Sequence, residues 1–298
     1  MSSLDRKNIA VIHCGAMYTQ ITDQDSLDEW LSSIWEIDIL AEVHPFFVSD
    51  AAQTHYEPEW KQTMAIIRNN WEEYHGFVVY VPASELIQCS IAASFILGHL
   101  GKPVVFTADS YARVLTEKNL SLMSNLINGT LMAISEHAGI YTLYDGNVYL
   151  PFQLQNISEH NRMEYIGESV ARIDFGLHIH AELPGRSSLA KPNKNVVEEI
   201  TELAHLQVSG PDDTGLRSIT AATPIDHIPT ITYKVEHNDP PTISCVIGDH
   251  HILLPMTEVS FITKVSWVLM NMKDTPDLET ILLQVMQKNV MGELITEL

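Results

Sequence analysis

Short apolar runs alternate with longer segments of helical periodicity through the first half of the chain. The runs have the length and the Gly or Pro boundaries of strands buried on both faces, and they cover residues 9–14, 76–81, 102–107 and 139–144. The helical patterns begin at residue 27 or cover residues 58–74, 84–100 and 120–137. Strands that alternate with helices form βαβ units, so the sequence predicts an α/β fold with a mostly parallel sheet flanked by helices.

A second domain is expected after residues 184–195, which are rich in Pro, Gly, Ser and Asn, as linkers are. A chain of 298 residues is long enough for two domains. We therefore expect a larger N-terminal α/β domain at 1–183 and a smaller, shortened C-terminal α/β domain at 196–298. The pattern is poor up to about residue 246, and two helices are expected after it, at 257–271 and 277–290.

The charge balance excludes several classes of function. The chain has 17 Lys and Arg against 38 Asp and Glu, a formal net charge of −21. Binding to nucleic acid or to an anionic membrane needs clustered basic residues, so neither is expected. The cysteines at positions 14, 89 and 245 are too few for a disulfide framework. The N-terminus has no signal-peptide pattern and no window approaches roughly 18 consecutive apolar residues, so a cytoplasmic location is expected.

Three segments directly follow predicted strands, which is where open α/β sheets bind their ligands. They are residues 15–18, 81–84 and 107–110. The residues in or next to them that could form a polar pocket are Gly15, Tyr18, Thr19, Ser84, Glu85 and Asp109.

Several segments follow one another in a particular order and spacing: Pro58-Glu-Trp60, Tyr74-His-Gly-Phe-Val-Val79, Ala92-Ala-Ser-Phe-Ile-Leu97, Gly101-Lys-Pro-Val-Val105, Ser124-Asn-Leu-Ile-Asn128, Met256-Thr257, Lys264-Val-Ser-Trp-Val-Leu269 and Lys288-Asn-Val-Met-Gly-Glu-Leu294. In this order and spacing the chain resembles the bacterial-type L-asparaginase/glutaminase family, close to its cytosolic type I branch. The resemblance covers most of residues 9–157 and 246–294, whereas about 180 to 245 aligns poorly. It implies a two-domain asparaginase-like fold that hydrolyses the side-chain amide of asparagine or glutamine. It also implies a threonine nucleophile and a second Thr-Asp-Lys group, with no cofactor.

The resemblance also implies where the catalytic residues would stand, and other residues occupy those positions. The family's Gly-Gly-Thr-Ile-Gly turn is here Gly15-Ala-Met-Tyr-Thr19, so Met17 stands where the nucleophile would be. The family's His-Gly-Thr-Asp-Thr motif is here Val81-Pro-Ala-Ser-Glu85, with Ala83 and Ser84 in place of the threonine and the aspartate.

The remaining positions depart from the family in the same way. A substrate-binding Asp-Ser pair becomes Asp50-Ala51, and a shift by one residue only substitutes Ala52. The catalytic lysine should fall near Gln153 to Asn156, yet no lysine occurs between residues 119 and 190. A thioether cannot be acylated usefully, and the members of a catalytic unit lose their effect together. The sequence therefore predicts a catalytically degenerate asparaginase-like protein, a pseudoenzyme that acts as a protein-binding or scaffold module.

Two enzymatic alternatives stay open. One is an amidohydrolase with a re-tooled site built from residues such as Cys14, Ser84 or Glu85, and the other is a genuine L-asparaginase whose motifs align differently. A Cys14–His13 pair could make a nucleophile, but adjacent strand residues point to opposite faces. Glu85 and Cys89 are spaced i, i+4 and share a helical face, where a surface carboxylate beside a packed thiol is the simpler interpretation.

Two segments contain histidines next to carboxylates, which are common metal ligands. His178 and His180 alternate along one segment with Glu182 after them, and Asp249 precedes two further histidines. Two histidines and a carboxylate can hold zinc or iron, but local spacing alone does not predict such a site. We expect packed or exposed histidines and no metal.

The partners expected from the sequence are proteins. The resemblance implies a homodimer, because family members pair closely into dimers or tetramers. The negative net charge predicts that any other protein partner is basic and that its binding weakens as salt rises.

Overall fold

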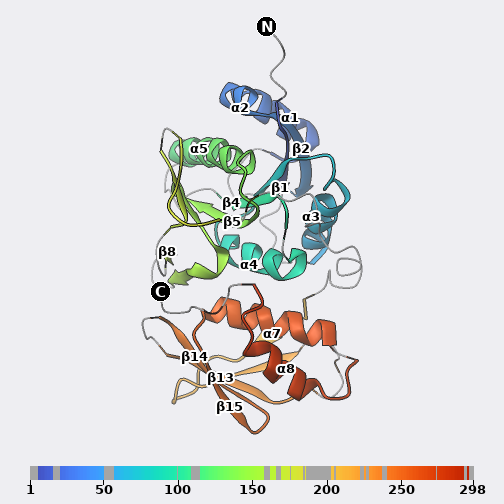
Figure 1. Cartoon of the computed structure of the whole chain (residues 1–298), viewed down its shortest axis with the longest axis vertical. Helices are drawn as coiled ribbons and strands as arrows, with labels where there is room; N and C mark the ends of the chain where they lie inside the picture. The colour runs from blue at the N-terminus through green and yellow to red at the C-terminus, as the bar shows by residue number, and fades with distance from the viewer. Residues whose placement is uncertain are drawn as a thin grey trace.

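The computed structural model describes residues 6–15, 21–49, 57–98, 100–108, 115–157, 162–165, 169–174, 176–183, 185, 203–204, 206–221, 225, 228–236, 240–272, 274–291 and 294. Figure 1 shows a larger unit, with helices on both sides of a sheet, next to a smaller unit with its own sheet and two helices.

The larger sheet has eight strands in the order β10-β9-β6-β5-β4-β3-β1-β2. Its parallel strands are β1 (Asn8–Cys14), β2 (Glu42–Ser49), β3 (Gly76–Tyr80), β4 (Pro103–Thr107) and β5 (Gly139–Tyr144). One edge is antiparallel and consists of β6 (Asn147–Tyr149), β9 (Ala171–Ile173) and β10 (Leu177–Ile179). The predicted α/β class with a mostly parallel sheet is confirmed.

Helices cover both faces of this sheet because its central strands are apolar on both sides. On one face Ile9 and Val11 pack in a cluster with α1 (Gln24–Ser32), α2 (Trp35–Leu40) and α5 (Leu115–Ala133). On the other face Ala10 and Ile12 pack in a cluster with α3 (Glu57–Asn69) and α4 (Leu86–Leu97). Successive strand residues point to opposite faces, so one apolar strand serves two cores. Each large aliphatic side chain buried in this way stabilises the fold by about 1.5–3 kcal/mol.

The smaller unit is built on a five-stranded antiparallel sheet in the order β11-β12-β13-β14-β15. Its elements are β11 (Leu206–Val208), β12 (Arg217–Ala221), β13 (Ile231–Glu236), β14 (Thr242–Ile247), β15 (His250–Leu254), α7 (Glu258–Met272) and α8 (Leu278–Met286). Alternate residues of β14 are buried, and they pack in one cluster with side chains of both helices.

Polar contacts join α7 to the sheet of the smaller unit and to the end of α8. Glu258 at the start of α7 accepts a hydrogen bond from the Tyr233 hydroxyl at 2.7 Å and pairs with Arg217 at 3.0 Å. Lys264 is fully buried, and its ammonium donates to the Met286 carbonyl at 3.2 Å and the Lys288 carbonyl at 2.5 Å. The buried charge is therefore satisfied by carbonyls at the end of α8.

The two units meet where α4 contacts α7. The Phe95 ring lies 5.6 Å from the Trp267 ring and 5.5 Å from the Phe152 ring, between centroids. Phe152 belongs to a short 3-10 turn, η1 (Pro151–Gln153), which precedes a hairpin of β7 (Leu154–Ile157) and β8 (Arg162–Tyr165). This contact is apolar and aromatic, as the interior of a domain is.

Several predicted helix ends differ from the observed ones. The first helix begins at Gln24 because the Asp23 carboxylate accepts from the Ser26 amide in a capping box. The helix predicted at 84–100 is shorter, at Leu86–Leu97, because Glu85 is its N-cap and Gly98 ends it. The other predicted helices are observed at Glu57–Asn69 instead of 58–74, Leu115–Ala133 instead of 120–137, Glu258–Met272 instead of 257–271 and Leu278–Met286 instead of 277–290, and α2 (Trp35–Leu40) was not predicted.

β2 has no counterpart among the predicted strands. It contains Pro45, which opposes Val11 of β1 in the parallel pair. Among the described residues β2 pairs with β1 alone, so it is an edge strand, where a proline is tolerated.

The predicted domain limits stay predictions. The linker at 184–195 lies outside the described residues except for Gly185, which forms an isolated antiparallel bridge with His137. In the described ranges no helix has the length and hydropathy needed to cross a membrane.

Replacement of Gly76 by alanine tests the close approach of β3 to α5. A Cβ on Gly76 would overlap the carbonyl oxygen of Ala133 at the end of α5. We expect Gly76→Ala to lower the free energy of unfolding by about 1–3 kcal/mol, measured by urea denaturation, because the packed backbone must shift.

The matched control is Gly210→Ala, since a Cβ at Gly210 has no neighbour within 4 Å. This control should change the free energy of unfolding by less than about 0.5 kcal/mol. Equal effects of the two substitutions would contradict the packing described for β3.

Candidate functional site

The carboxyl ends of three neighbouring strands meet at one edge of the larger sheet. β1 pairs with β3 and β3 with β4, and the register places His13 opposite Tyr80 and Tyr80 opposite Thr107. Gly15, Val81 and Ala108 follow these strand ends. Ligands of open α/β sheets bind at this edge, so it is the candidate site.

The backbone at the end of β1 is irregular. The pairing of β1 with β2 shifts between His13 and Cys14, so that Cys14 lies opposite Ser49. Gly15 then takes a φ of 89°, in the left-handed region that residues with a Cβ rarely enter. The backbone therefore departs from regular strand geometry at Cys14 and Gly15, as it does at bulges near functional sites.

His13 is held as a packed ring. Its side chain is 1% exposed and stacks between the rings of Phe47 and Tyr80, each with a centroid 5.7 Å away. The ring Nδ1 lies 3.1 Å from the carbonyl oxygen of Ser49. The Gly15 amide also donates to this Nδ1, at 3.4 Å. Burial and stacking hold the imidazole in one orientation.

Cys14 faces the other side of the sheet. Its Sγ lies 2.9 Å from the hydroxyl oxygen of Thr63 on α3, and the side chain packs on the cluster of α3 and α4. The rings that stack on His13 belong to other clusters, with Phe47 on the opposite face. The two residues point to opposite faces, as expected for neighbours in a strand, and they do not form a Cys–His pair.

The turn after β3 has a buried apolar side chain next to an exposed polar one. Ala83 is 9% exposed and packs on the cluster of α3 and α4, whereas Ser84 points to solvent as an exposed residue. Glu85 is half-buried at the N-cap of α4, and its amide donates to the Pro82 carbonyl at 2.9 Å. Cys89 is buried in the core one turn further on, so Glu85 and Cys89 differ in exposure although they are one turn apart.

The polar groups at the end of β4 bond to main-chain carbonyls. The Thr107 hydroxyl donates to the Leu143 carbonyl at 3.2 Å, and the Asn125 side-chain amide donates to the Ala108 carbonyl at 2.6 Å. Both side chains are buried. Sequence reasoning did not assign these roles, although Asn125 lies in the segment 124–128 that carries part of the resemblance.

Several predicted site residues lie outside the described residues, so their placement stays a prediction. They are Met17, Tyr18, Thr19, Ala51, Ala52 and Asp109. Asn156 lies in β7, where it pairs with Met163 of β8. Of the predicted pocket, Gly15, Ser84 and Glu85 are placed at or near the carboxyl edge.

The histidines with nearby carboxylates belong to separate sheets. His178 lies in β10 with Nε2 3.2 Å from the Asp174 carbonyl oxygen, and His251 lies in β15 with Nε2 2.9 Å from the Ser244 hydroxyl. Within the described ranges no three His, Cys, Asp or Glu side chains gather as metal ligands would. The structure does not bring these two segments together.

No disulfide joins Cys14, Cys89 or Cys245, all of which lie in the described part of the chain. Burial raises the pKa of Cys245 to about 12, so this thiol stays protonated at neutral pH. Cys89 is also buried, and Cys14 is the half-buried one at the candidate edge. A thiolate nucleophile is therefore not expected from Cys245.

Three solved structures share the fold of the whole chain or of most of it. L-asparaginase I from Vibrio cholerae O1 biovar eltor matches with a TM-score of 0.63 at 13% identity, covering 98% of this chain and 100% of that one. The thermostable L-asparaginase from Thermococcus kodakarensis matches with a TM-score of 0.65 at 17% identity, covering 97% and 100%. A probable cytoplasmic L-asparaginase from Campylobacter jejuni matches with a TM-score of 0.54 at 15% identity, covering 70% and 69%.

A comparison with curated protein sequences gave no match. The family model described as asparaginase, N-terminal, matches residues 9–169, which is more than half of the chain. This range contains the strands β1 to β5 and the edge at which they end. The chain therefore belongs to the asparaginase family.

Proposed function

We propose that the chain is a catalytically degenerate member of the asparaginase family that acts as a protein-binding or scaffold module in the cytoplasm. The observation that carries this proposal is the turn after β3. The family's threonine and aspartate would stand at Ala83 and Ser84, and here one of these is a methyl group buried against the core. A methyl group neither transfers a proton nor holds an ammonium or carboxylate.

The other side chains at this edge support the same proposal. His13 is stacked between two aromatic rings, and Thr107 and Asn125 are committed to main-chain carbonyls. These polar groups stabilise the strand ends. Because the Thr107 hydroxyl and the Asn125 side-chain amide donate to the main chain, these hydrogen bonds are not available to orient a small substrate.

The lysine pattern supports it as well. No lysine occurs between residues 119 and 190, where the family's catalytic lysine would fall. Lys102 precedes β4, at the opposite edge of the sheet, and its ammonium donates to the carbonyls of Trp71 and Tyr74. It holds the loop before β3 and is turned away from the candidate edge.

The proposed assembly is a homodimer that also binds a basic protein. The homodimer follows from the family resemblance, and the basic partner follows from the net charge of −21. No cofactor or metal is proposed.

The direct test is ammonia release from L-asparagine and L-glutamine at high protein concentration. We expect the purified protein and the Met17→Thr variant to stay at the background rate. Restoring one member of a catalytic unit leaves the others missing, namely the groups replaced at Ala83 and Ser84 and the lysine.

An active asparaginase assayed beside them shows that the conditions support turnover. Substantial ammonia release by the wild-type chain would contradict the proposal and favour a genuine asparaginase. Substantial release by Met17→Thr alone would contradict the assignment of the missing groups.

A second experiment separates a degenerate site from a re-tooled one. Cys14 is half-buried at the candidate edge and touches Thr63, so it is the thiol best placed to act as a nucleophile. Across a panel of amide substrates, we expect Cys14→Ala and Ser84→Ala to leave product formation at the same background as the wild type. Turnover by the wild type that either variant abolishes, while Met17→Ala retains it, would favour the re-tooled amidohydrolase.

A further inference from the structure

The helix α2 exposes two large apolar side chains on one face. Trp35 is 64% exposed and Ile39 is 66% exposed. They are spaced i, i+4 and therefore lie one above the other on the helix surface. Ile37 on the opposite side of α2 is buried in the core, so the helix is held in place by other contacts. Trp35 and Ile39 belong to none of the hydrophobic clusters of the described residues.

Acidic residues surround this pair in the sequence and on the adjoining elements. Between Lys7 and Lys61 the chain has no lysine and no arginine. In the same stretch α1, α2 and the start of β2 carry six acidic residues. The four nearest to the pair in sequence are Glu29, Glu36, Asp38 and Glu42, of which all but Glu36 are exposed. We call Trp35 and Ile39 together with these four acidic residues the α2 face.

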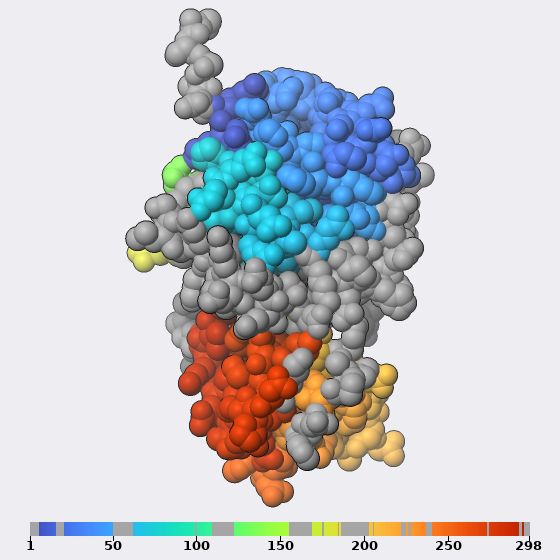
Figure 2. Space-filling model, turned by 90° about the vertical axis from the view of Figure 1, so that its right-hand side faces the viewer, coloured from blue at the N-terminus to red at the C-terminus, as the bar shows by residue number. Residues whose placement is uncertain are grey.

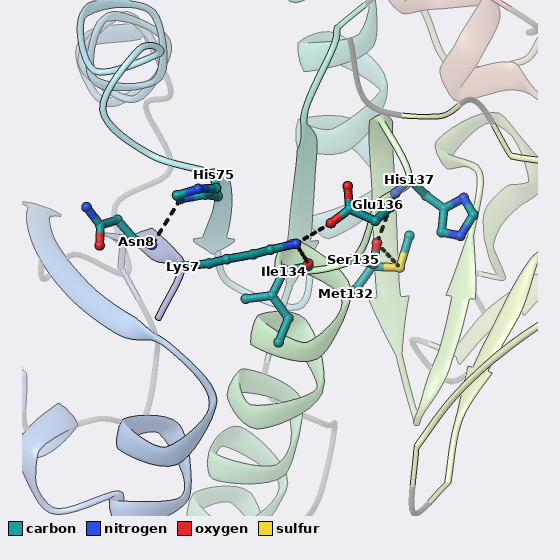
Figure 3. Close-up of polar contacts among 8 residues, drawn as sticks. All are labelled: Lys7, Asn8, His75, Met132, Ile134, Ser135, Glu136 and His137. Carbon is teal, nitrogen blue, oxygen red and sulfur yellow. Dashed lines mark hydrogen bonds and ion pairs between the residues drawn. The ribbon is translucent and has the colours of Figure 1, made fainter. Parts of the chain in front are cut away.

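The nearby basic residues leave the charge of the α2 face largely in place. The Lys7 ammonium donates to the Ile134 carbonyl at 2.8 Å and pairs with the Glu136 carboxylate, both at the end of α5 (Figure 3). Arg6 contacts α2 at the main-chain carbonyl of Asp38, at 2.5 Å. One arginine against four carboxylates leaves this face negative.

The α2 face lies away from the candidate site. The contact of Arg6 with Asp38 and the hydrogen bond from the Glu42 amide to the Lys7 carbonyl place the end of α2 at the amino ends of β1 and β2. Figure 1 shows α1 and α2 at the end of the molecule opposite the five-stranded sheet. In Figure 2 the blue atoms, which include those of α1 and α2, form one continuous surface at that end.

The negative charge of the α2 face determines which kind of partner can bind it. A second copy placed face to face would bring two acidic surfaces together, and like-charge juxtaposition costs several kcal/mol. An anionic membrane is repelled for the same reason. A positively charged segment with its own apolar side chains would pair with the carboxylates and cover Trp35 and Ile39, and Arg or Lys could also stack on the indole.

We propose that the α2 face binds a basic amphipathic helix of a partner protein. This inference rests on the proposed scaffold function. It adds the surface that binds and the kind of partner that is bound. Tryptophan is among the residues that carry most of the energy of protein interfaces, so Trp35 is the central contact.

The test is the fluorescence anisotropy of a labelled peptide of about 18 residues, with leucines on one helical face and lysines on the other. The peptide should bind the full chain, and Trp35→Ala/Ile39→Ala should weaken its affinity about tenfold or more. Glu29→Lys/Asp38→Lys should weaken it by a similar factor. The same peptide with glutamate in place of lysine should not bind.

Matched controls change the same chemistry elsewhere on the surface. Leu216→Ala/Leu253→Ala removes two exposed apolar side chains of the smaller unit, and Asp213→Lys/Asp249→Lys makes the same charge change there. Each control should alter the affinity by less than about twofold, since surface changes outside an interface have little effect.

Three results would overturn the proposal. The controls could weaken binding as much as the α2 variants do, which would mean non-specific attraction to an acidic protein. The α2 variants could leave the affinity unchanged. The α2 variants could instead dissociate a homodimer in sedimentation velocity, which would make a second copy the occupant. Ammonia release is measured separately, so an active enzyme would contradict the proposed function while peptide binding would still decide the role of the α2 face.

Discussion

The fold depends on three central strands, β1, β3 and β4, whose side chains are buried on both faces of the sheet. All residues of β3 and β4 are buried, and β1 is buried except at its ends. Backbone groups in such strands must pair with neighbours, and apolar side chains on both faces must be covered by helices. The apolar strands therefore require helices on both faces of the sheet. Their parallel pairing also brings their carboxyl ends together at one edge.

At that edge several buried side chains pack against their neighbours or bond to the main chain. His13, Ala83 and Asn125 are buried there, and each contributes to holding a strand end or a turn. The family fold places the ends of β1, β3 and β4 together whether or not they carry catalytic groups. The scaffold role that we propose would use a surface away from this edge, such as the α2 face.

The parallel core could be predicted because its signal is local. The strand at 139–144 was predicted with its observed bounds, since an apolar run between Gly139 and the turn after Tyr144 has few alternatives. The opposite facing of His13 and Cys14 also followed from strand geometry alone. β2 was missed because Pro45 and its partly exposed residues resemble an irregular segment. The five-stranded antiparallel sheet was missed because its strands alternate buried and more exposed residues and lack the continuous apolar runs of β3 and β4.

The candidate site was harder to predict than the fold. The assignment of Ala83 and Ser84 to the family's threonine and aspartate positions stays a prediction from the family pattern, whereas the packing of His13 between Phe47 and Tyr80 needed the tertiary structure. The central claim is that this edge no longer holds an amino-acid substrate. Isothermal titration calorimetry with L-aspartate, the product of asparagine hydrolysis, tests this most directly. The account predicts no saturable heat up to millimolar ligand, whereas a dissociation constant below about 1 mM, in the range of enzyme–substrate affinities, would contradict it.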